Sequence, residues 1–138
     1  MEYKNGYLQR VEQRYSYNES RVRVSECTWR DGNLVEAKCT DYNEDGTDIT
    51  TVKYSYSQTA TPINIDLFYI DGWYIDVLEP LDLLGFYGRQ SAKLPNKADI
   101  IYSGESESES DDFGVYTLND DGTVARIDCG SVSYELIY

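Results

Sequence analysis

A short unit that recurs along the chain constrains its fold more than any other feature. The stretches "NGYLQRV" (5–11), "DGNLVEA" (31–37) and "DGTVARI" (121–127) share the form [DN]-G-x-[LV]-x-x-[VAI]. Asn-Gly and Asp-Gly between alternating strands are the strongest short-range signal for a β-hairpin, because a type I′ turn requires positive φ at both central residues. Asp45-Gly46 and Asp71-Gly72 repeat the dipeptide. The chain is therefore expected to be a series of antiparallel hairpins.

Tyrosines follow several of these turns at a spacing of two, which places each set on one face of its strand. The sets, each with a preceding valine of the same parity, are Val11, Tyr15 and Tyr17; Val52, Tyr54 and Tyr56; and Val132, Tyr134, Leu136 and Tyr138. The alternate positions are largely polar, and 14 tyrosines with many β-branched residues suit a half-buried sheet. The pattern predicts one buried face and one wet face, with these tyrosines on the buried side.

The stretch "DYNEDGTDITTV" (41–52) begins like a calcium-binding loop. Asp41, Asn43 and Asp45 occupy alternate positions, and a glycine follows them at the place where an EF-hand turns sharply. However, the twelfth position is Val52 rather than a bidentate Glu, Asp48 replaces an apolar residue, and strands are expected on both sides. We interpret the stretch as a turn, with calcium binding at Asp41, Asn43, Asp45 and Asp48 as the less favoured alternative and no cofactor expected.

The segment from about 58 to 97 interrupts the hairpins and is the most apolar part of the chain. Pro at the first helical position and Gly at the end predict a short helix over about 80–87, with Leu81 and Leu84 on one face. One interpretation is a plug that covers the apolar face of the sheet. The other is a ligand pocket built from aromatic residues: Trp73, Tyr74, Phe86 and Tyr87.

Two further features bear on organisation. The stretch 103–112, "SGESESESDD", alternates serine and acid, so it is expected to be a solvated acidic loop within a single domain spanning 1–138. Cys27, Cys39 and Cys129 are an odd set without metal-binding spacing. With a two-residue turn at Asp31-Gly32, Cys27 would face Glu36 rather than Cys39, so a disulfide there is not favoured and the redox state stays open.

Composition excludes several classes of function. A net charge of −13 argues against nucleic acid, and no apolar run approaches the ~18 residues of a membrane helix. The chain has no histidine, which removes Ser-His and Cys-His pairs and the commonest metal ligand. A pair of carboxylates could still serve a hydrolase, but 25 acidic residues make any single choice uninformative. The chain is therefore expected not to be an enzyme.

Two classes of function remain. An exposed aromatic on a rigid sheet can stack on a sugar ring or anchor a protein partner, and Trp29, Trp73, Tyr74 and Tyr87 are the candidates. For Trp29 the structural alternative is cross-strand packing beside a turn, with Leu34 as its neighbour. A scaffold would instead use unpaired strand edges near 3–10 and 134–138, with the oligomeric state open.

The units "W-x-D-G-N-L-V-x-A" (29–37) and "Y-T-L-N-D-D-G-T-V-x-x-I" (116–127) resemble the YD-type repeats of secreted bacterial proteins. Together with the G-x-x-G-x-x-S-x-x-L-P spacing from Gly85 to Pro95, the order of parts resembles a Tyr-rich domain of unknown function in exported lipoproteins of gut bacteria. The resemblance implies a porin-like curved sheet or partial barrel and an extracytoplasmic location, with the leader removed before Met1. It brings no catalytic residues.

These observations predict a mainly β fold, an antiparallel meander of hairpins that forms a curved sheet or partial barrel with one short helix on its apolar face. The expected role is a noncatalytic extracytoplasmic binding or scaffold domain of a bacterial lipoprotein. A glycan-binding module is the alternative, and a carboxylate-based hydrolase is the less favoured one.

Overall fold

The computed structural model describes residues 1–56, 89, 91–93, 95–105, 108–112, 115–129 and 132–136. Within them lie ten strands: β1 (Glu2–Lys4), β2 (Tyr7–Tyr15), β3 (Asn18–Arg30), β4 (Asn33–Asn43), β5 (Gly46–Ser55), β6 (Lys97–Tyr102), β7 (Glu109–Asp112), β8 (Val115–Leu118), β9 (Val124–Cys129) and β10 (Val132–Glu135). No helix in the described part is long and apolar enough to cross a membrane.

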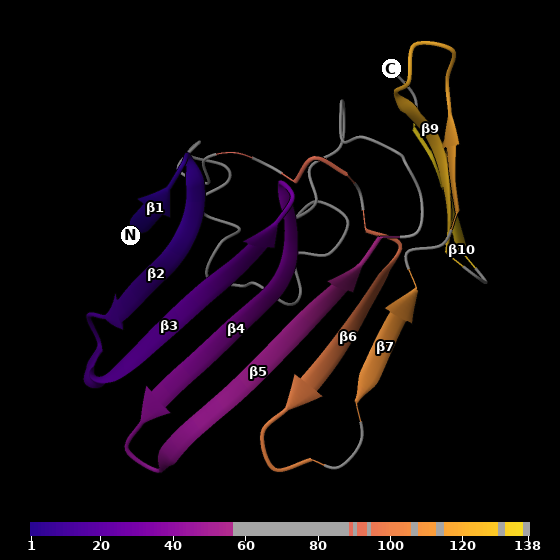
Figure 1. Ribbon diagram of the computed structural model, residues 1–138. Coiled ribbons are helices and arrows are strands. Elements are labelled where there is room, and N and C mark those ends of the chain that lie inside the picture. Colours follow the sequence, from indigo (N-terminus) through magenta and orange to yellow (C-terminus); the bar gives the residue numbers. More distant parts are fainter. Residues whose placement is uncertain are drawn as a thin grey trace.

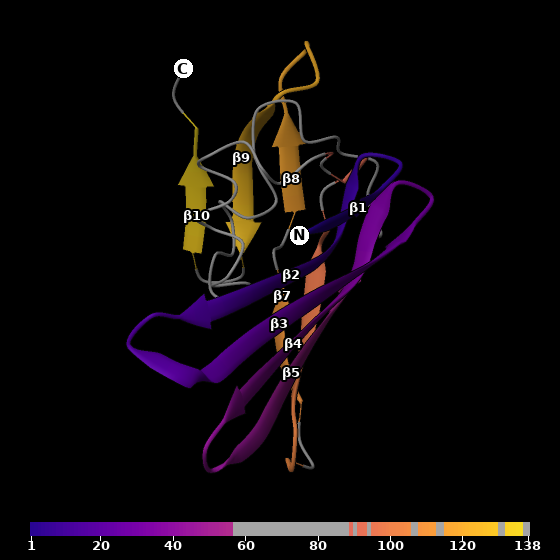
Figure 2. The same cartoon turned by 90° about the vertical axis from the view of Figure 1, so that its left-hand side faces the viewer.

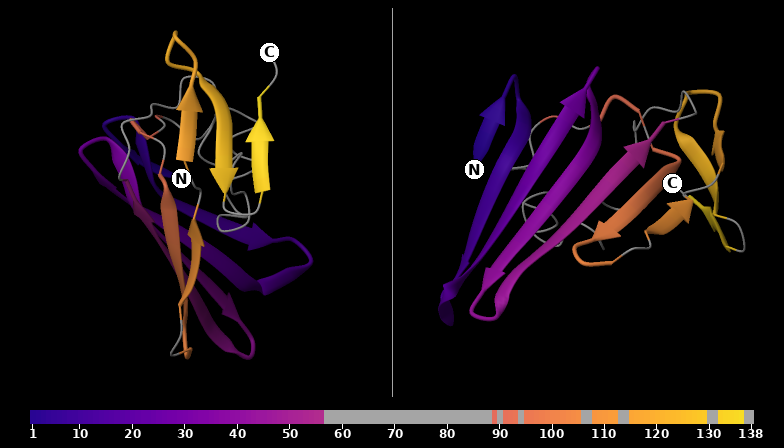
Figure 3. Two further views of the ribbon diagram at one scale, coloured as in Figure 1. Left: turned by 90° about the vertical axis from the view of Figure 1, so that its right-hand side faces the viewer. Right: turned by 60° about the horizontal axis from the view of Figure 1, so that its bottom comes forward.

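The strands form two antiparallel meanders (Figure 1). Seven strands follow one another in the order β1 to β7, and three form a second sheet in the order β10-β9-β8. The larger sheet is strongly twisted, and the smaller one stands beside its upper end (Figure 2). The larger sheet stays open among the described strands, with β1 and β7 as its edges (Figure 3). The prediction of a mainly β antiparallel meander is confirmed.

Two of the predicted type I′ turns are present. Asn5 and Gly6 have φ of 54° and 85°, and Asp31 and Gly32 have φ of 51° and 78°. These are the left-handed values that asparagine, aspartate and glycine tolerate best. Each pair connects adjacent strands with a two-residue loop, β1 to β2 and β3 to β4.

Two further turns differ from that expectation, and the predicted turn at Asp71-Gly72 lies outside the described residues. Asn43 pairs with Gly46, so the centre of the β4–β5 turn is Glu44-Asp45 and the glycine follows it as the first residue of β5. In the β8–β9 turn the N–H of Gly122 donates to the carbonyl of Asn119 (2.9 Å), and Gly122 has φ of 84°. This is a three-residue loop closed by a left-handed glycine. The dipeptide therefore marks the turn, but its position within the turn varies.

A bulge at the β3–β4 tip changes the predicted register. Trp29 pairs with Leu34, as expected, but the register shifts between Thr28 and Trp29. In consequence Cys27 faces Ala37 instead of Glu36. Neither Cys27 nor Cys39 is in a disulfide.

The core lies on one face of the larger sheet and includes residues of the smaller one. Its buried members are Leu8, Val11, Cys27, Leu34, Ala37, Val52, Tyr54, Ala98, Ile100, Tyr116, Val124 and Ile127. Tyr54 and its valine are buried as predicted, and Tyr56 packs against the cluster. Tyr17 and Tyr134 are exposed (77% and 56%), so the prediction that they face the core is wrong. Tyr17 lies in the turn after β2, beyond the strand whose alternation it was assigned to.

The connection from β5 to β6 returns across the tips of the hairpins. The N–H of Arg89 donates to the carbonyl of Gly6 (2.8 Å), that of Ala92 to Gly32 (2.9 Å), and that of Asn96 to Ser55 (2.9 Å). These described residues (89, 91–93, 95 and 96), called the strap below, thus contact the β1–β2 turn, the β3–β4 turn and the end of β5. Pro95 continues the path, because its carbonyl accepts a hydrogen bond from the Tyr116 hydroxyl on β8.

Three predictions about segments have different outcomes. Glu109–Asp112 form β7 and pair with β6, so the last four residues of the predicted acidic loop (103–112) are a strand instead. Extended acidic residues can donate and accept backbone hydrogen bonds like any others, and β6 offered an open edge. The predicted helix over 80–87 lies outside the described residues. The single-domain assignment stays a prediction.

Candidate functional site

Of the aromatic residues predicted to bind a ligand, the structure describes Trp29. Trp73, Tyr74 and Tyr87 lie outside the described residues. The indole N–H of Trp29 donates to the carbonyl of Leu8 (2.7 Å), and its ring lies 4.7 Å from that of Tyr7. The Arg89 guanidinium of the strap lies 5.8 Å from the Tyr7 ring. The polar atom and one ring face of Trp29 are thus engaged within the fold. Trp29 also pairs with Leu34 across β3 and β4 and packs against the buried core.

The four residues of the calcium alternative are spread along one hairpin end. Asn43 Oδ1 accepts from the N–H of Asp45 (2.9 Å), which fixes the turn, and its amide nitrogen lies 3.4 Å from Asp48 Oδ2. Asp41 is on β4 opposite Asp48, but its carboxylate is bound by two arginines. No group of three or more metal-ligating side chains occurs in the described ranges.

Asp41 is the centre of a cluster that the sequence did not predict. Arg21 Nε and Nη2 donate to its two oxygens (3.1 and 2.6 Å), and Arg23 Nε and Nη2 donate to Oδ2 (3.3 and 3.0 Å). Bidentate guanidinium–carboxylate pairs fix both planar groups. Asp41 itself is only 14% exposed. The carboxylate therefore holds two cations in one orientation.

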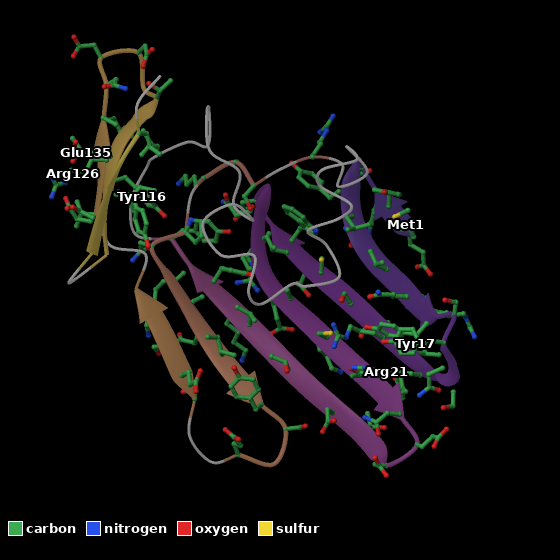
Figure 4. All side chains as sticks on the ribbon, turned by 180° about the vertical axis from the view of Figure 1, so that it is seen from behind. Met1, Tyr17, Arg21, Tyr116, Arg126 and Glu135 are labelled. Carbon is green, nitrogen blue, oxygen red and sulfur yellow. The ribbon has the colours of Figure 1, made fainter. Side chains whose placement is uncertain are left out.

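Two tyrosines extend this cluster outward. The Arg21 guanidinium lies 4.8 Å from the ring of Tyr15, and the Tyr17 ring meets Tyr15 edge to face at 5.4 Å. Such guanidinium–π and edge-to-face contacts are favourable and hold the rings in place. Figure 4 shows Tyr17 and Arg21 side by side at the end of the β2–β3 hairpin. Tyr15, Tyr17, Arg21, Arg23 and Asp41 are called the tyrosine–arginine platform below.

The electrostatics of the platform favour fixed charges. Hydrogen bonds from Arg21, then from Arg23, hold the pKa of Asp41 below its usual range, against the effect of burial. The same bond to Asp41 raises the pKa of the Arg21 guanidinium. Both groups are therefore charged across the physiological range, and neither is tuned to exchange a proton near neutral pH.

Two buried polar atoms that lack a hydrogen-bond partner among the described residues lie on the same face. Gln13 pairs with Arg23 across β2 and β3, and Ser25 follows Arg23 by two positions on the same strand. The two atoms are Gln13 Oε1 and Ser25 Oγ. Because buried polar atoms in native proteins are nearly always paired, a partner for each is expected outside the described residues or from a bound water.

The platform presents an aromatic ring on which a planar ligand can stack. Tyr17 is 77% exposed, and Tyr15 supports it from the side. On the adjoining strand β3, Ser20 Oγ donates a hydrogen bond to Glu44 (2.9 Å). The signal in the sequence was Arg-x-Arg at 21–23, which places both cations on the face of β3 that Tyr15 shares on β2.

Comparison with known proteins bears on the fold. No family model matches the sequence, and no curated protein matches it. The crystal structure of a porin-like protein from Bacteroides vulgatus is similar, with a TM-score of 0.64 and 17% identity over 91% of this chain. The chain has a porin-like β fold. It spans 55% of the length of that protein, and at this identity the likeness concerns the fold alone.

The porin-like fold confirms one part of what the sequence resemblance implied. The YD-type repeat, the lipoprotein precursor and the extracytoplasmic location stay predictions.

Proposed function

We propose that this porin-like chain is a noncatalytic binding domain of a bacterial lipoprotein that works outside the cytoplasm. Its ligand-binding site is the tyrosine–arginine platform. The observation that carries the proposal is the 77% exposed Tyr17 ring, held by Tyr15 and backed by a guanidinium that Asp41 fixes. A ring that is both exposed and held loses little conformational entropy when a ligand stacks on it.

The charge state of the platform supports binding over catalysis. General acid–base chemistry uses groups whose pKa lies near the working pH. Here the ion pair lowers the pKa of Asp41 and raises the pKa of Arg21, so both values lie away from that range. A carboxylate hydrolase at this site would need the opposite shift, a raised pKa on one acid.

A glycan is the ligand class that the surroundings favour. Sugars offer a C–H face to an aromatic ring and hydroxyls to side-chain donors and acceptors. Arg21 makes its described contacts with Asp41 and Tyr15, which leaves guanidinium N–H groups for an acceptor. The residues that flank Tyr17 in the sequence, Ser16 and Asn18, are polar, and Ser16 is exposed, whereas a protein-binding surface would present a broad apolar patch.

The location is supported by the resemblance to exported lipoproteins and by the likeness to a porin-like protein of a bacterium. Cell fractionation followed by detection of the chain tests this part separately. Recovery in the cytoplasmic fraction would contradict it.

Thermal melts test the binding proposal. The wild type, Tyr17→Ala and the control Tyr134→Ala are melted in EGTA, in millimolar calcium and with soluble polysaccharides. A ligand at 100 times its Kd stabilises the folded state by about 2.7 kcal/mol, a shift of several degrees. We expect a polysaccharide to raise the Tm of the wild type and of Tyr134→Ala, but not of Tyr17→Ala.

Other outcomes would change the assignment. A calcium shift would direct attention to Asp41, Asp45 and Asp48. Release of reducing ends from a polysaccharide would show a hydrolase. Equal polysaccharide-induced increases in Tm for Tyr17→Ala and the wild type would show that the ligand does not bind at the platform.

A further inference from the structure

Part of the Arg21 guanidinium in the tyrosine–arginine platform is open to a ligand. Arg21 donates to Asp41 through Nε and Nη2, and no acceptor for its Nη1 lies among the described residues. The Arg21 side chain is 32% exposed. Its two Nη1 N–H groups are therefore directed at no described partner and can donate to a ligand that stacks on Tyr17, which lies beside Arg21 in Figure 4.

A carboxylate without a cation lies next to Asp41 on the same face. Asp48 pairs directly with Asp41 across β4 and β5, and directly paired residues of antiparallel strands have neighbouring side chains on one face of the sheet. Asp48 is exposed, and its carboxylate lies 3.4 Å from the amide nitrogen of Asn43. Within the described ranges no ion pair joins Asp48 to a lysine or an arginine. Its negative charge thus acts on the surface beside the two arginines.

The turn that follows β4 adds two more carboxylates. Glu44 and Asp45 form the centre of the β4–β5 turn, are exposed, and have no ion pair with the part of the chain that the structure describes. Asp41 neutralises one of the two positive charges that it binds, which leaves one against three unpaired carboxylates. Arg14 points to the opposite face of the sheet, where it binds Glu12. A glycan with carboxylate or sulfate groups is therefore repelled here, and the net charge of −13 adds to the repulsion.

A glycan with ammonium groups is disfavoured for a different reason. The atoms of the platform that are open to a ligand beside Tyr17 are donors on a cation, so an ammonium there meets a like charge and offers no acceptor. A sugar hydroxyl meets both requirements, because it accepts from Arg21 Nη1 and donates to a carboxylate such as that of Asp48. The two signs of charge together favour a ligand with hydroxyls and no charge of its own.

We infer that the platform binds an uncharged glycan, with Arg21 Nη1 as the donor to its hydroxyls and with Asp48 as the group that excludes acidic sugars. The inference rests on the proposed function, because it specifies the ligand class of the same site. An uncharged ligand gains no Coulomb energy that salt can screen. Its Kd should therefore change less than about twofold between about 0.1 M and about 1 M NaCl, where the Debye length falls from about 10 Å to about 3 Å.

Matched polymers test the ligand class. Dextran, hydroxyethyl cellulose, galactomannan and arabinoxylan are each compared with their carboxymethylated and aminated derivatives in thermal melts of the wild type and of Tyr17→Ala. A rise in Tm is assigned to the platform where Tyr17→Ala abolishes it. We expect at least one neutral polymer to raise the wild-type Tm by several degrees at saturation, and its two charged derivatives to leave it unchanged. Calorimetric titration of that polymer measures the salt dependence.

A charge reversal tests the role of Asp48. In Asp48→Lys the repulsion of anions is removed, so we expect the carboxymethylated derivative of the same polymer to raise the Tm of this variant. The control is Asp120→Lys, which makes the same change of charge at an exposed position in the β8–β9 turn of the smaller sheet. It is expected to behave like the wild type. Circular dichroism verifies that both variants fold.

The outcomes separate the inference from the proposed function. A charged derivative that raises the wild-type Tm as much as its neutral parent, and depends on Tyr17, would overturn the inference and leave the glycan site in place. No platform-dependent shift with any polymer would contradict the proposed function itself. Equal responses of Asp48→Lys and Asp120→Lys to the carboxymethylated polymer would overturn the role of Asp48.

Discussion

The backbone N–H of Leu34 donates a hydrogen bond of 2.9 Å to Ser91 Oγ, joining residues 57 positions apart. Both residues are buried, and the Tyr56 hydroxyl lies 3.3 Å from the same oxygen. Tyr56 in turn donates to the carbonyl of Leu34 (2.6 Å). Ser91 of the strap and Tyr56 therefore satisfy the backbone N–H and carbonyl of Leu34 at the start of β4. These contacts, together with those of the platform, lead to five predictions.

Ser91→Ala removes the acceptor for the Leu34 N–H and leaves a buried donor unpaired. Such a loss costs about 1–3 kcal/mol of unfolding free energy. Urea titration monitored by tryptophan fluorescence measures it, with the exposed Ser133→Ala as the control that is expected to change little. Equal stability of the two variants would show that the strap does not hold the β3–β4 tip.

Gly32→Ala tests the approach of the strap to a turn. A Cβ there would lie 3.3 Å from the Tyr7 hydroxyl and 3.5 Å from Ala92 Cβ, at φ of 78°. Gly104→Ala is the matched control, since φ is 84° and no atom lies within 4 Å. Both variants incur the left-handed penalty of roughly 1–2 kcal/mol, and we expect Gly32→Ala to lose more. Equal losses of stability in the two variants would show that the whole loss in Gly32→Ala comes from the left-handed backbone conformation and none from contact with the strap.

Alkaline pH is expected to destabilise the chain through Tyr56. Burial raises the pKa of Tyr56 to about 12 from 10.0, against the lowering effect of the Ser91 hydrogen bond. The unfolded chain therefore loses this proton first, so the stabilisation is complete below pH 10 and is lost as the pH rises towards 12. Tyr56→Phe should be less stable at neutral pH by about 1 kcal/mol.

The difference between Tyr56→Phe and the wild type is expected to narrow over the same alkaline range. Urea titrations at a series of pH values measure it. A constant difference would mean that Tyr56 does not contribute to the alkaline loss.

Acid pH is expected to weaken the platform through Asp41. Because its pKa is held below 3.8, the carboxylate contributes stability above that pH, and the contribution is lost as the pH falls through the folded-state value. Asp41→Asn should lower the Tm at neutral pH, with a smaller difference from the wild type in acid. Asp45→Asn, at an exposed turn position, is the control. A difference that grows in acid would contradict this assignment.

Trp29→Phe separates packing from ligand binding. The variant loses the N–H that donates to Leu8 and is expected to lose about 1–3 kcal/mol of stability, because that carbonyl is left without its donor. Polysaccharide-induced shifts in Tm should stay as in the wild type. If the shift disappears in Trp29→Phe but persists in Tyr17→Ala, the site belongs to Trp29 instead.

Much of the larger sheet could be predicted because its signals are local. The left-handed turns at Asn5-Gly6 and Asp31-Gly32 need only the tolerance of those residues for positive φ, and alternation correctly buried Val52 and Tyr54. The candidate site was missed because alternation does not state where a strand ends. Tyr17 is two residues after Tyr15, as the alternation requires, but β2 ends at Tyr15. Tyr17 therefore lies in the turn that follows, where its ring is exposed.

The sequence by itself determined the antiparallel order of strands, because turn residues and a period of two act over a few neighbouring positions. Tertiary structure alone decided that Asp41 meets Arg21 and Arg23, and that Arg89, Ser91 and Ala92 lie across the hairpin tips. These contacts depend on strand register and on the return of a distant segment. The bulge at Thr28–Trp29 shifts that register, and no local propensity specifies it.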